Sequence, residues 1–371
     1  MIKFDLNITD RKILVKENTE NIIDDNNEYI YNDIFDVAII GGGFAGLSAA
    51  LLLGRYLRST IIFDVKETRK SLIHGYLGFE KTSREDLIQI AWHNVLQYDS
   101  IKRVENKVED IEKDTNNNLF LITTATTKSY VKENNFDKME NNIIRKSKAR
   151  AKYLIICTGI KHIKPQIKNF EDYDGNGIWH CPHCDGFETA NKKLIVIASD
   201  NENNKAIDYA KVFLGWTKDI TLFIQQSFEN KNDQTKCYLT DQQRNEARIL
   251  GINVIENDGI AEIIGNSKTN TINGVISKSN KFFKADILFY HFGKKVQNEI
   301  AVKLGCELDE EYIKVDKNQQ TTVPKVYAAG DVDIDRHYAI LAAASGALAA
   351  ISIYEDLLKQ AIKTKKIENN F

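Results

Sequence analysis

The sequence lacks an excess of charge of either sign. Lysine and arginine together number 50 and aspartate and glutamate 52, which leaves a net charge of −2 at neutral pH. A chain without a basic surplus has no general electrostatic attraction to nucleic acid or to another polyanion. We therefore expect no nucleic-acid partner.

Long apolar runs are also lacking. The longest candidate, residues 37–53, is interrupted by glycines and is followed closely by Arg55, so it does not read as a membrane span. The first 33 residues are polar and hold no apolar segment after a basic start, which predicts no secretory signal peptide. We expect a cytoplasmic protein that does not contact a membrane.

Cysteine and proline are scarce. The 3 prolines, set against abundant lysine, asparagine and isoleucine, reflect genome bias. An odd count of 5 cysteines in 371 residues does not make a disulfide scaffold. A reducing compartment fits this count, with one pair kept for chemistry. Length alone suggests two or three domains.

One pair of cysteines is closely spaced, in the segment Trp179-His180-Cys181-Pro182-His183-Cys184-Asp185-Gly186. Cys181 and Cys184 can close a small disulfide ring and open it again, and neighbouring imidazoles, if charged, favour the attacking thiolate. The alternative is half of a structural zinc site, which usually takes four ligands from two such pairs. The other cysteines each stand alone in the sequence, so redox chemistry is favoured and no metal is expected.

A dinucleotide fingerprint lies near the start of the chain. The apolar run of residues 35–40 predicts a buried parallel strand, which leads directly into Gly41-Gly42-Gly43-Phe44-Ala45-Gly46. A helix is expected over residues 47–57 and a second strand over 60–63, followed by Asp64. Asp64 lies about 20 residues beyond the glycines, where this fingerprint places an acid that binds a ribose. The glycines would let backbone N–H groups approach a pyrophosphate.

Further elements are expected along the chain. The pattern Thr82 to Glu85 predicts a capping box that opens a helix, and strands are expected over residues 104–111, 119–124 and 151–156. Residues 128–148 are charged and rich in asparagine, which indicates a surface insertion. A second strand-helix-strand unit is expected over 193–224, and Thr240 to Gln243 predicts another capping box. A strand over 326–329 runs into Gly330-Asp331, and a helix of small residues is expected over 339–351.

Taken in order, these landmarks resemble the low-molecular-weight thioredoxin reductase family of flavoproteins. The resemblance covers residues 34–360 and rests on the glycine turn, Thr158-Gly159, the Cys-x-x-Cys-Asp-Gly segment, the second nucleotide-type unit and Ala329-Gly330-Asp331. His74-Gly75-Tyr76-Leu77-Gly78 and Trp179-His180-Cys181-Pro182 resemble a thioredoxin reductase-like branch, related to dithiol oxidases of the gliotoxin and holomycin type.

The resemblance implies an α/β fold with two Rossmann-like three-layer domains, the second inserted into the first. An FAD-binding domain would comprise residues 34–164 and 290–371, and an inserted NAD(P)-binding-like domain, residues 165–289, would carry the cysteines. Residues 1–33 would form an N-terminal arm, either an edge strand or a loose segment. A homodimer is also implied by the family.

The resemblance also assigns roles to residues. Cys184 would exchange electrons with the flavin, Cys181 would attack the partner disulfide, and Asp185 would donate a proton to the departing thiolate. A simple helix cap is the alternative role for Asp185. The expected FAD contacts are Gly41, Gly43, Phe44, Ala45, Gly46, Asp64, Val108, Thr158, Gly159, Gly330, Asp331 and Ala339. Where the family usually has Arg-Gln before that alanine, this chain has His337-Tyr338.

The second nucleotide-type unit departs from the family pattern. Its turn, Ala198-Ser199-Asp200-Asn201-Glu202-Asn203, has no glycine, and the strand that follows ends in Gln225-Gln226-Ser227 without an arginine. Side chains in such a turn hold a pyrophosphate off the backbone, and a carboxylate repels it. NADPH is therefore a doubtful electron donor.

Three functions agree with these features. The first is an FAD-dependent reductase that passes electrons through Cys181 and Cys184 to a thioredoxin-like protein or a small-molecule disulfide. The second is a dithiol oxidase that forms a disulfide and gives electrons to oxygen. The third is a flavin-bound redox sensor without turnover, which would not need a dedicated proton donor such as Asp185.

Overall fold

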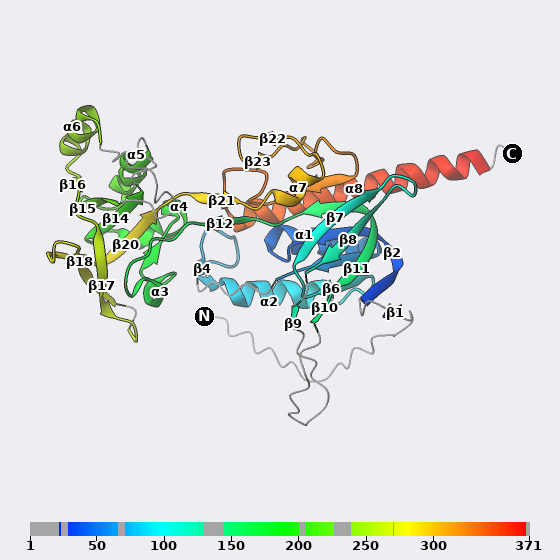
Figure 1. The fold of residues 1–371 in the computed structure, drawn as a ribbon, viewed down its shortest axis with the longest axis horizontal. Helices are drawn as coiled ribbons and strands as arrows, with labels where there is room; N and C mark the ends of the chain where they lie inside the picture. The colour runs from blue at the N-terminus through cyan, green and yellow to red at the C-terminus, as the bar shows by residue number, and fades with distance from the viewer. Residues whose placement is uncertain are drawn as a thin grey trace, which may run out of the picture.

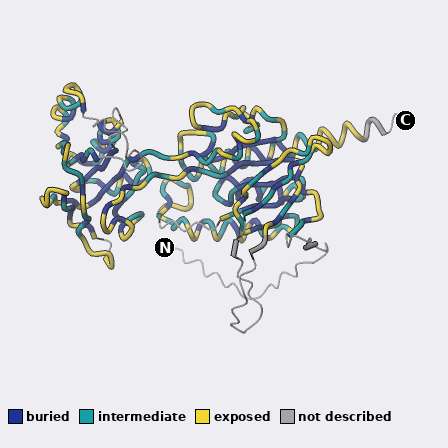
Figure 2. Tube along the Cα trace, viewed as in Figure 1, coloured by how far each residue is buried: buried dark blue, intermediate teal, exposed yellow. Residues whose placement is uncertain are grey.

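The computed structural model describes residues 22–23, 29–65, 71–125, 127–128, 144–199, 205–225, 239–269 and 271–368. The described chain forms a larger and a smaller lobe, joined by a narrow connection (Figure 1). Buried residues follow the strands of both lobes, whereas the helix ends and loops are exposed (Figure 2). Each lobe therefore has its own core.

The larger lobe is built on a sheet centred on β2 (Tyr29–Ile40) and β11 (Ser147–Ile156), which run parallel to each other. Strand β3 (Thr60–Phe63) extends this parallel sheet on one side, followed by β6 (Ile101–Val104). On the other side, β11 pairs in parallel with β24 (Val326–Ala328) and antiparallel with β8 (Leu119–Thr124), which pairs with β7 (Val108–Asp114). The strand β1 (Ile22–Ile23) pairs with the start of β2.

Three helices of the larger lobe share a core with one face of this sheet: α1 (Phe44–Arg55), α2 (Arg84–Val95) and α8 (Ala339–Glu368). The continuous apolar strands are explained by burial on both faces, since a second core fills the opposite face. The lobe is completed by α7 and short strand pairs: α7 (Glu299–Lys303), β4 (Leu72–Ile73), β5 (Thr82–Ser83), β9 (Thr127–Lys128), β10 (Ile144–Arg145), β22 (Leu308–Asp309) and β23 (Tyr312–Ile313).

The smaller lobe has a parallel sheet of five strands. Their order is β13 (Ile178–Trp179), β20 (Ile287–His291), β14 (Leu194–Ser199), β15 (Ile220–Gln225) and β16 (Asn253–Ile255). Two further cores flank this sheet, and they include residues of the remaining elements: α3 (Phe170–Tyr173), α5 (Lys205–Val212), α6 (Asp241–Ile249), β17 (Ile260–Asn266), β18 (Thr271–Ser277) and β19 (Phe282–Lys284). The short helix α4 (Pro182–Asp185) holds the cysteine pair.

The chain leaves the larger lobe through β12 (Ile160–His162) and returns through β21 (Lys294–Val296), and these two strands pair antiparallel (Figure 1). The α/β architecture expected from the sequence, with two nucleotide-type units, is confirmed. Several expected bounds were wrong. The first strand is longer than expected and begins at Tyr29, and the strand expected over residues 104–111 is two strands, β6 and β7.

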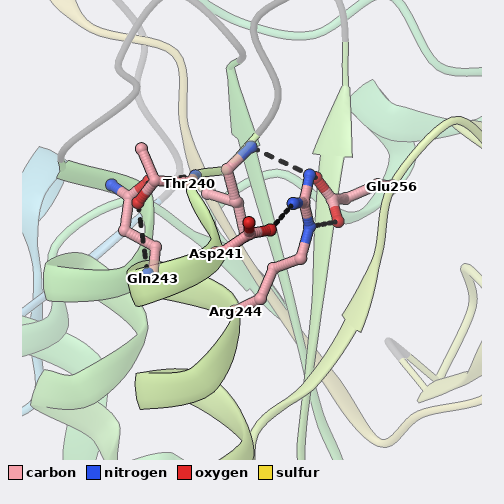
Figure 3. Close-up of polar contacts among 6 residues, drawn as sticks. Thr240, Asp241, Gln243, Arg244 and Glu256 are labelled. Carbon is pink, nitrogen blue, oxygen red and sulfur yellow. Dashed lines mark hydrogen bonds and ion pairs between the residues drawn. The ribbon is translucent and has the colours of Figure 1, made fainter.

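Helix starts show which local signals were reliable. In α6 the expected capping box is present: Thr240 accepts a bond from the N–H of Gln243, whose side chain accepts one from the N–H of Thr240 (Figure 3). Arg244 makes a bidentate contact with Glu256. Its Nε donates to Oε2 of Glu256 at 2.8 Å, and its Nη2 donates to Oε1 at 3.1 Å. In α2 the cap is Ser83 rather than Thr82: its Oγ accepts a hydrogen bond from the N–H of Asp86 at 3.0 Å. In α1 the helix begins at Phe44, directly after the glycine turn, and ends at Arg55.

Helix α8 is much longer than the expected 339–351. Its residues 339–364 are long and apolar enough to cross a membrane by length and composition, which corrects the expectation that no segment is. Ala349, Ala350 and Ile353 on its inner face are fully buried in the core shared with α1. Only 22% of this apolar window is buried, so α8 packs one face into the core shared with α1 and leaves the rest of its surface exposed.

Gly346 of α8 offers a direct test of this packing. A Cβ at Gly346 would lie 2.0 Å from the carbonyl oxygen of Ala45 in α1, so Gly346→Ala must push the two helices apart. We expect a loss of about 1–3 kcal/mol in the free energy of unfolding, the usual cost of overpacking. Chemical denaturation of the purified variant measures it. Ala344→Ser, at an exposed position of the same helix, should change stability by less than about 0.5 kcal/mol. Equal stability of both variants would contradict this packing.

Candidate active site

The glycine turn joins β2 to α1 through close backbone contacts. Gly41 has a φ of +115°, and a Cβ there would lie 2.2 Å from the carbonyl oxygen of Cys157. A Cβ on Gly46 would lie 1.9 Å from the carbonyl oxygen of Gly41. Both glycines are therefore needed for the strand and helix to meet. Gly43 differs, because a Cβ there meets no atom within 4 Å. The backbone at Gly43 faces open space at the start of α1.

Asp64 follows β3 and reaches back to this turn. Its Oδ1 accepts a hydrogen bond from the N–H of Gly42 at 3.1 Å, and its Oδ2 lies 3.6 Å from Nη2 of Arg103. Burial raises the pKa of Asp64, while the Gly42 N–H and Arg103 lower it in part. Arg103, whose guanidinium lies 4.1 Å from the Trp92 ring centroid, was not singled out from the sequence. Its position at the end of β6, beside the end of β3, could have been inferred only from strand order.

The other expected contact residues gather near the carboxyl ends of neighbouring parallel strands. Thr158 and Gly159 follow β11. The side chain of Gln297 fixes this segment, because its Nε2 donates a hydrogen bond to the carbonyl oxygen of Thr158 at 2.6 Å. Gly330 follows β24, has a φ of +89° and donates its N–H to Ser345 of α8 at 2.8 Å. A Cβ on Gly330 would lie 2.9 Å from the Cβ of Ala45. Strand order therefore brings residues far apart in the sequence to one edge of the sheet.

Asp331 comes directly after Gly330, and Ala339 is the first residue of α8. Val108 is buried at the start of β7 and pairs with Thr124, which contacts Ser147 at the start of β11, so the described contacts do not place Val108 at this edge. Asp333 has a buried carboxylate oxygen without a partner among the described residues, and burial followed by the charge of Asp331 raises its pKa to about 7. An open glycine turn, an acid at the position that the fingerprint expects, and an unsatisfied polar atom at the carboxyl edge of a parallel sheet fit a bound dinucleotide.

The cysteine pair forms a disulfide at the start of α4. Cys181 and Cys184 are bonded, with their Cα atoms 5.3 Å apart, and the N–H of Cys184 lies 3.2 Å from Sγ of Cys181. Pro182 occupies the first helical turn, where its missing N–H costs nothing. Two sulfurs joined in a disulfide are not thiolate ligands, so the structure supports the redox interpretation over the zinc alternative. Cys157 and Cys306 are buried free thiols, and Cys237 lies outside the described residues.

Asp185, the last residue of α4, is buried with 7% of its surface exposed. Burial raises its pKa to about 7; the charge of His74 lowers it and that of Glu188 raises it. No side-chain capping bond from Asp185 to the following helical turn is present, which removes the capping alternative. A carboxyl half protonated near neutral pH, next to a disulfide, can donate a proton or accept one.

Histidines bring the disulfide segment against the larger lobe. The ring of His180, next to Cys181, lies 3.7 Å from that of His162 on β12, measured between centroids. His162 in turn lies 6.4 Å from His337, which shortly precedes α8. Burial and Lys294 lower the pKa of His337 to about 4, so this ring is neutral at pH 7. His183 is exposed. The disulfide therefore lies at the junction between the lobes, near the start of α8.

The nucleotide-type edge of the smaller lobe is organised differently. Ala198 and Ser199 are buried, and residues 200–204 of the glycine-free turn lie outside the described part of the chain. Gln225, at the end of β15, is 2% exposed, and its Oε1 accepts a hydrogen bond from the N–H of Ile260 at 2.9 Å. Gln225 therefore points into the lobe, and its buried Nε2 has no partner among the described residues. Gln226 and Ser227 also lie outside the described residues.

Comparisons with known proteins agree with this geometry. A family model described as pyridine nucleotide-disulphide oxidoreductase matches residues 35–348. A thioredoxin reductase of Listeria monocytogenes is 26% identical over 307 residues, which cover 81% of this chain and 86% of that protein. The crystal structure of a putative thioredoxin reductase, TrxB, from Bacillus anthracis superposes with a TM-score of 0.72 at 26% identity and covers 88% of this chain and 99% of its own.

One more solved structure shares the fold. The crystal structure of HlmI superposes with a TM-score of 0.76 and covers 92% of this chain and 98% of its own, at 21% identity. That likeness concerns the fold alone. The family model, in contrast, spans most of the chain and includes the glycine turn, the disulfide and Gly330-Asp331. FAD is the cofactor that this membership indicates, and the dinucleotide-shaped edge of the larger lobe fits it.

The chain belongs to the pyridine nucleotide-disulphide oxidoreductase family and is a thioredoxin reductase-like flavoprotein disulfide oxidoreductase.

Proposed function

We propose that this protein passes electrons between FAD and a partner disulfide through Cys181 and Cys184. The observation that carries the proposal is the position of the disulfide. The ring contact between His180 and His162 holds the disulfide segment at the junction with the larger lobe, near the start of α8. A dithiol that exchanges electrons with a flavin must lie close to it, and the junction with the larger lobe is such a position.

FAD would bind along the carboxyl edge of the larger sheet. The supporting residues are Gly41, Gly43, Phe44, Ala45, Gly46, Asp64, Thr158, Gly159, Gly330, Asp331 and Ala339. The proposed FAD-binding domain is 34–164 with 290–371, and the inserted domain is 165–289. Bound FAD supplies or accepts an electron pair. The positive end of α8 would face it, since Ala339 opens that helix.

The two cysteines have different proposed roles. As a thiolate, Cys181 attacks the partner disulfide, forming a mixed disulfide and releasing one partner thiolate. Cys184 then attacks Cys181, which restores the Cys181–Cys184 bond and releases the second partner thiolate. The two thiol protons of the reduced pair end on the two partner thiols. Asp185 takes a proton from one cysteine and gives it to a departing thiolate, for which a pKa near 7 is suitable.

NADPH would be a poor electron donor. Gln225, the last described residue of β15, is buried and bonded to the N–H of Ile260, so its side chain is not available to a ribose or its phosphate. The turn after β14 has no glycine. A ferredoxin-like protein, a reduced dithiol or another flavin carrier would supply electrons instead.

The proposed acceptor is a thioredoxin-like protein or a small-molecule disulfide. A homodimer is also proposed, and the exposed apolar side chains on the outer face of α8 support it: Ile340, Leu341, Leu348, Ile351, Leu358 and Ile362. A dithiol oxidase that uses oxygen is the second candidate, favoured by the unsuitable nicotinamide edge at Gln225. A sensor without turnover is not favoured, because Asp185 is built as a proton donor beside the disulfide.

The roles of the cysteines can be separated by substitution. Cys181→Ser should leave Cys184 free to show a long-wavelength thiolate–flavin absorbance band, whereas Cys184→Ser should not. Both variants should lose disulfide turnover, because one thiol cannot complete the exchange. Anaerobic absorbance spectra and a disulfide-reduction assay measure the two effects. A band seen only in Cys184→Ser would reverse the assignment.

Gly43→Val tests the FAD site. The backbone of Gly43 has an extended conformation that valine can adopt, and no protein atom obstructs the new side chain. We expect a folded protein that loses bound flavin, because the side chain fills the space a pyrophosphate needs. Flavin absorbance per chain at dilute protein concentration, together with circular dichroism, gives the result. Gly215→Val, at an equally open glycine in the smaller lobe, serves as the control. Full FAD content in Gly43→Val would show that the proposed placement is wrong.

The donor prediction is tested without oxygen. Stopped-flow mixing with NADPH up to millimolar concentration should bleach the flavin slowly, and NADH should do no better. The reason is that the sequence of the turn after β14 has no glycine to let its backbone approach a pyrophosphate, and that Gln225 at the end of β15 is buried and bonded to the N–H of Ile260. Mixing with a reduced dithiol is the comparison. Rapid, saturable bleaching at micromolar NADPH would restore an ordinary NADPH-dependent reductase.

A further inference from the structure

Asp64, the acid of the proposed FAD site, lies between the glycine turn and β6. Its Oδ1 accepts the N–H of Gly42 at 3.1 Å, and its Oδ2 lies 3.6 Å from Nη2 of Arg103. A Cβ on Gly42 would lie 2.5 Å from Cγ of Asp64 and 2.7 Å from Cζ2 of Trp92 on α2. No side chain at position 42 fits between the acid and this ring. Gly42 therefore serves the packing around Asp64, whereas Gly43 faces open space.

Arg103 is held in place from two directions. Its guanidinium lies 4.1 Å from the centroid of the Trp92 ring, and its Nη2 lies 3.0 Å from Oε1 of Glu105. Trp92 is 6% exposed, so the guanidinium rests on a fixed surface, a contact that the flat arginine head makes better than lysine. Nε of Arg103 is buried without a partner among the described residues, and an unpaired buried donor costs stability. Stability alone therefore does not explain an arginine at this position.

Two charged side chains act on Asp64 in opposite directions. Burial is the largest influence and raises the pKa of Asp64, while the N–H of Gly42 and the charge of Arg103 lower it. The charge of Glu105 raises that pKa, and the N–H of Val65 lowers it. A hydrogen bond to an ionised carboxylate is stronger than one to a neutral carboxyl. Arg103 therefore favours the form of Asp64 that binds a hydroxyl more strongly, and Glu105 opposes it.

The geometry points to Arg103, packed on Trp92, as the residue that fixes Asp64 for the adenosine ribose of FAD. The inference rests on the proposed FAD site and adds a residue that the sequence did not single out. The N–H of Gly42 lies at one oxygen of the carboxylate and Nη2 of Arg103 lies beside the other, so the plane of the carboxylate is set from both sides. Each oxygen keeps lone pairs for a ribose hydroxyl. Arg103 acts through Asp64 and is therefore a positioning residue.

The test measures how tightly each variant holds FAD, without any measurement of turnover. Full-length protein freed of flavin is titrated with FAD or with its 2′-deoxyadenosine analogue between pH 5.5 and pH 8.5. Bound flavin is measured by absorbance after ultrafiltration, and circular dichroism checks the fold. The variants are Arg103→Gln, Arg103→Lys, Glu105→Gln and Asp64→Asn. The control is Arg244→Gln, which removes a similar arginine–carboxylate pair, with Glu256, from the smaller lobe.

The affinity for FAD and its pH dependence should both change. At pH 8, Arg103→Gln should bind FAD about tenfold more weakly, the scale of one hydrogen bond to a charged group. Binding to the unmodified protein should weaken as pH falls, because Asp64 becomes protonated and loses its charge. Without Arg103 the pKa of Asp64 is higher, so in Arg103→Gln this weakening should begin at a higher pH. Glu105→Gln should shift it to lower pH, and Arg103→Lys, which keeps the charge, should shift it less than Arg103→Gln.

The analogue separates positioning from general stabilisation. The unmodified protein should prefer FAD over the 2′-deoxyadenosine analogue by about tenfold, because the analogue leaves the carboxylate without its hydroxyl partner. This preference should fall towards equal binding in Arg103→Gln and in Asp64→Asn. Arg244→Gln should match the unmodified protein in affinity, preference and pH dependence.

Other results would overturn the inference or its basis. If Arg103→Gln keeps both the preference for FAD and the original pH dependence, the inference is wrong and the proposed function stands. Weaker binding of both flavins with an unchanged preference would show that Arg103 only stabilises the lobe, which also overturns it. If Asp64→Asn keeps the preference, the proposed ribose contact of Asp64 itself fails. If Arg103→Gln does not fold, Glu105→Gln decides, since the Glu105 side chain is 61% exposed, and an unshifted pH dependence there would overturn the inference.

Discussion

The structure depends on backbone contacts around the first turn of α1. Gly41 lies against the carbonyl of Cys157 on one side and, through Gly46, against the start of the helix on the other. Gly346 of α8 lies against the carbonyl of Ala45. No residue with a Cβ fits these places without moving β2, β11, α1 or α8. The same contacts fix the carboxyl edge of the sheet, so the packing of the larger lobe and the shape of its cofactor site have one cause.

These backbone contacts need glycines at fixed positions, and for this reason the first part of the fold could be predicted from the sequence. A buried apolar run, a glycine turn and an acid about 20 residues later are local signals, and the structure confirms the strand, helix and strand that they predict. The capping box at Thr240 was equally local and is present. The cap of α2 was missed by one residue: both Thr82 and Ser83 can cap a helix, and it is Ser83 whose side chain accepts the N–H of Asp86.

Contacts between distant segments could not be read from the sequence. Arg103 reaches Asp64 because β6 and β3 are neighbours in the sheet, and Gln297 reaches Thr158 because the chain returns beside its point of departure. Such partners follow from strand order, which the spacing of apolar residues does not specify. The length of α8 was underestimated for a related reason. Residues 354–364 are mostly exposed and include Glu355, Asp356, Lys359 and Lys363, so the composition changes while the helix continues.

The placement of Asp185 shows how the two lobes divide the chemistry between them. The smaller lobe supplies burial, which makes the carboxyl hold its proton up to a pKa of about 7, and Glu188 adds to that effect. His74 of the larger lobe acts in the opposite direction and lowers the pKa of Asp185. With burial alone, the pKa of this carboxyl would be higher and it would release its proton less readily. With a nearby cation alone, its pKa would be lower and it would be ionised at neutral pH. Because the two influences come from different lobes, the proton affinity of Asp185 depends on how the lobes meet. Any motion that separates the lobes would therefore change the acidity of Asp185 together with the distance between the disulfide and the flavin.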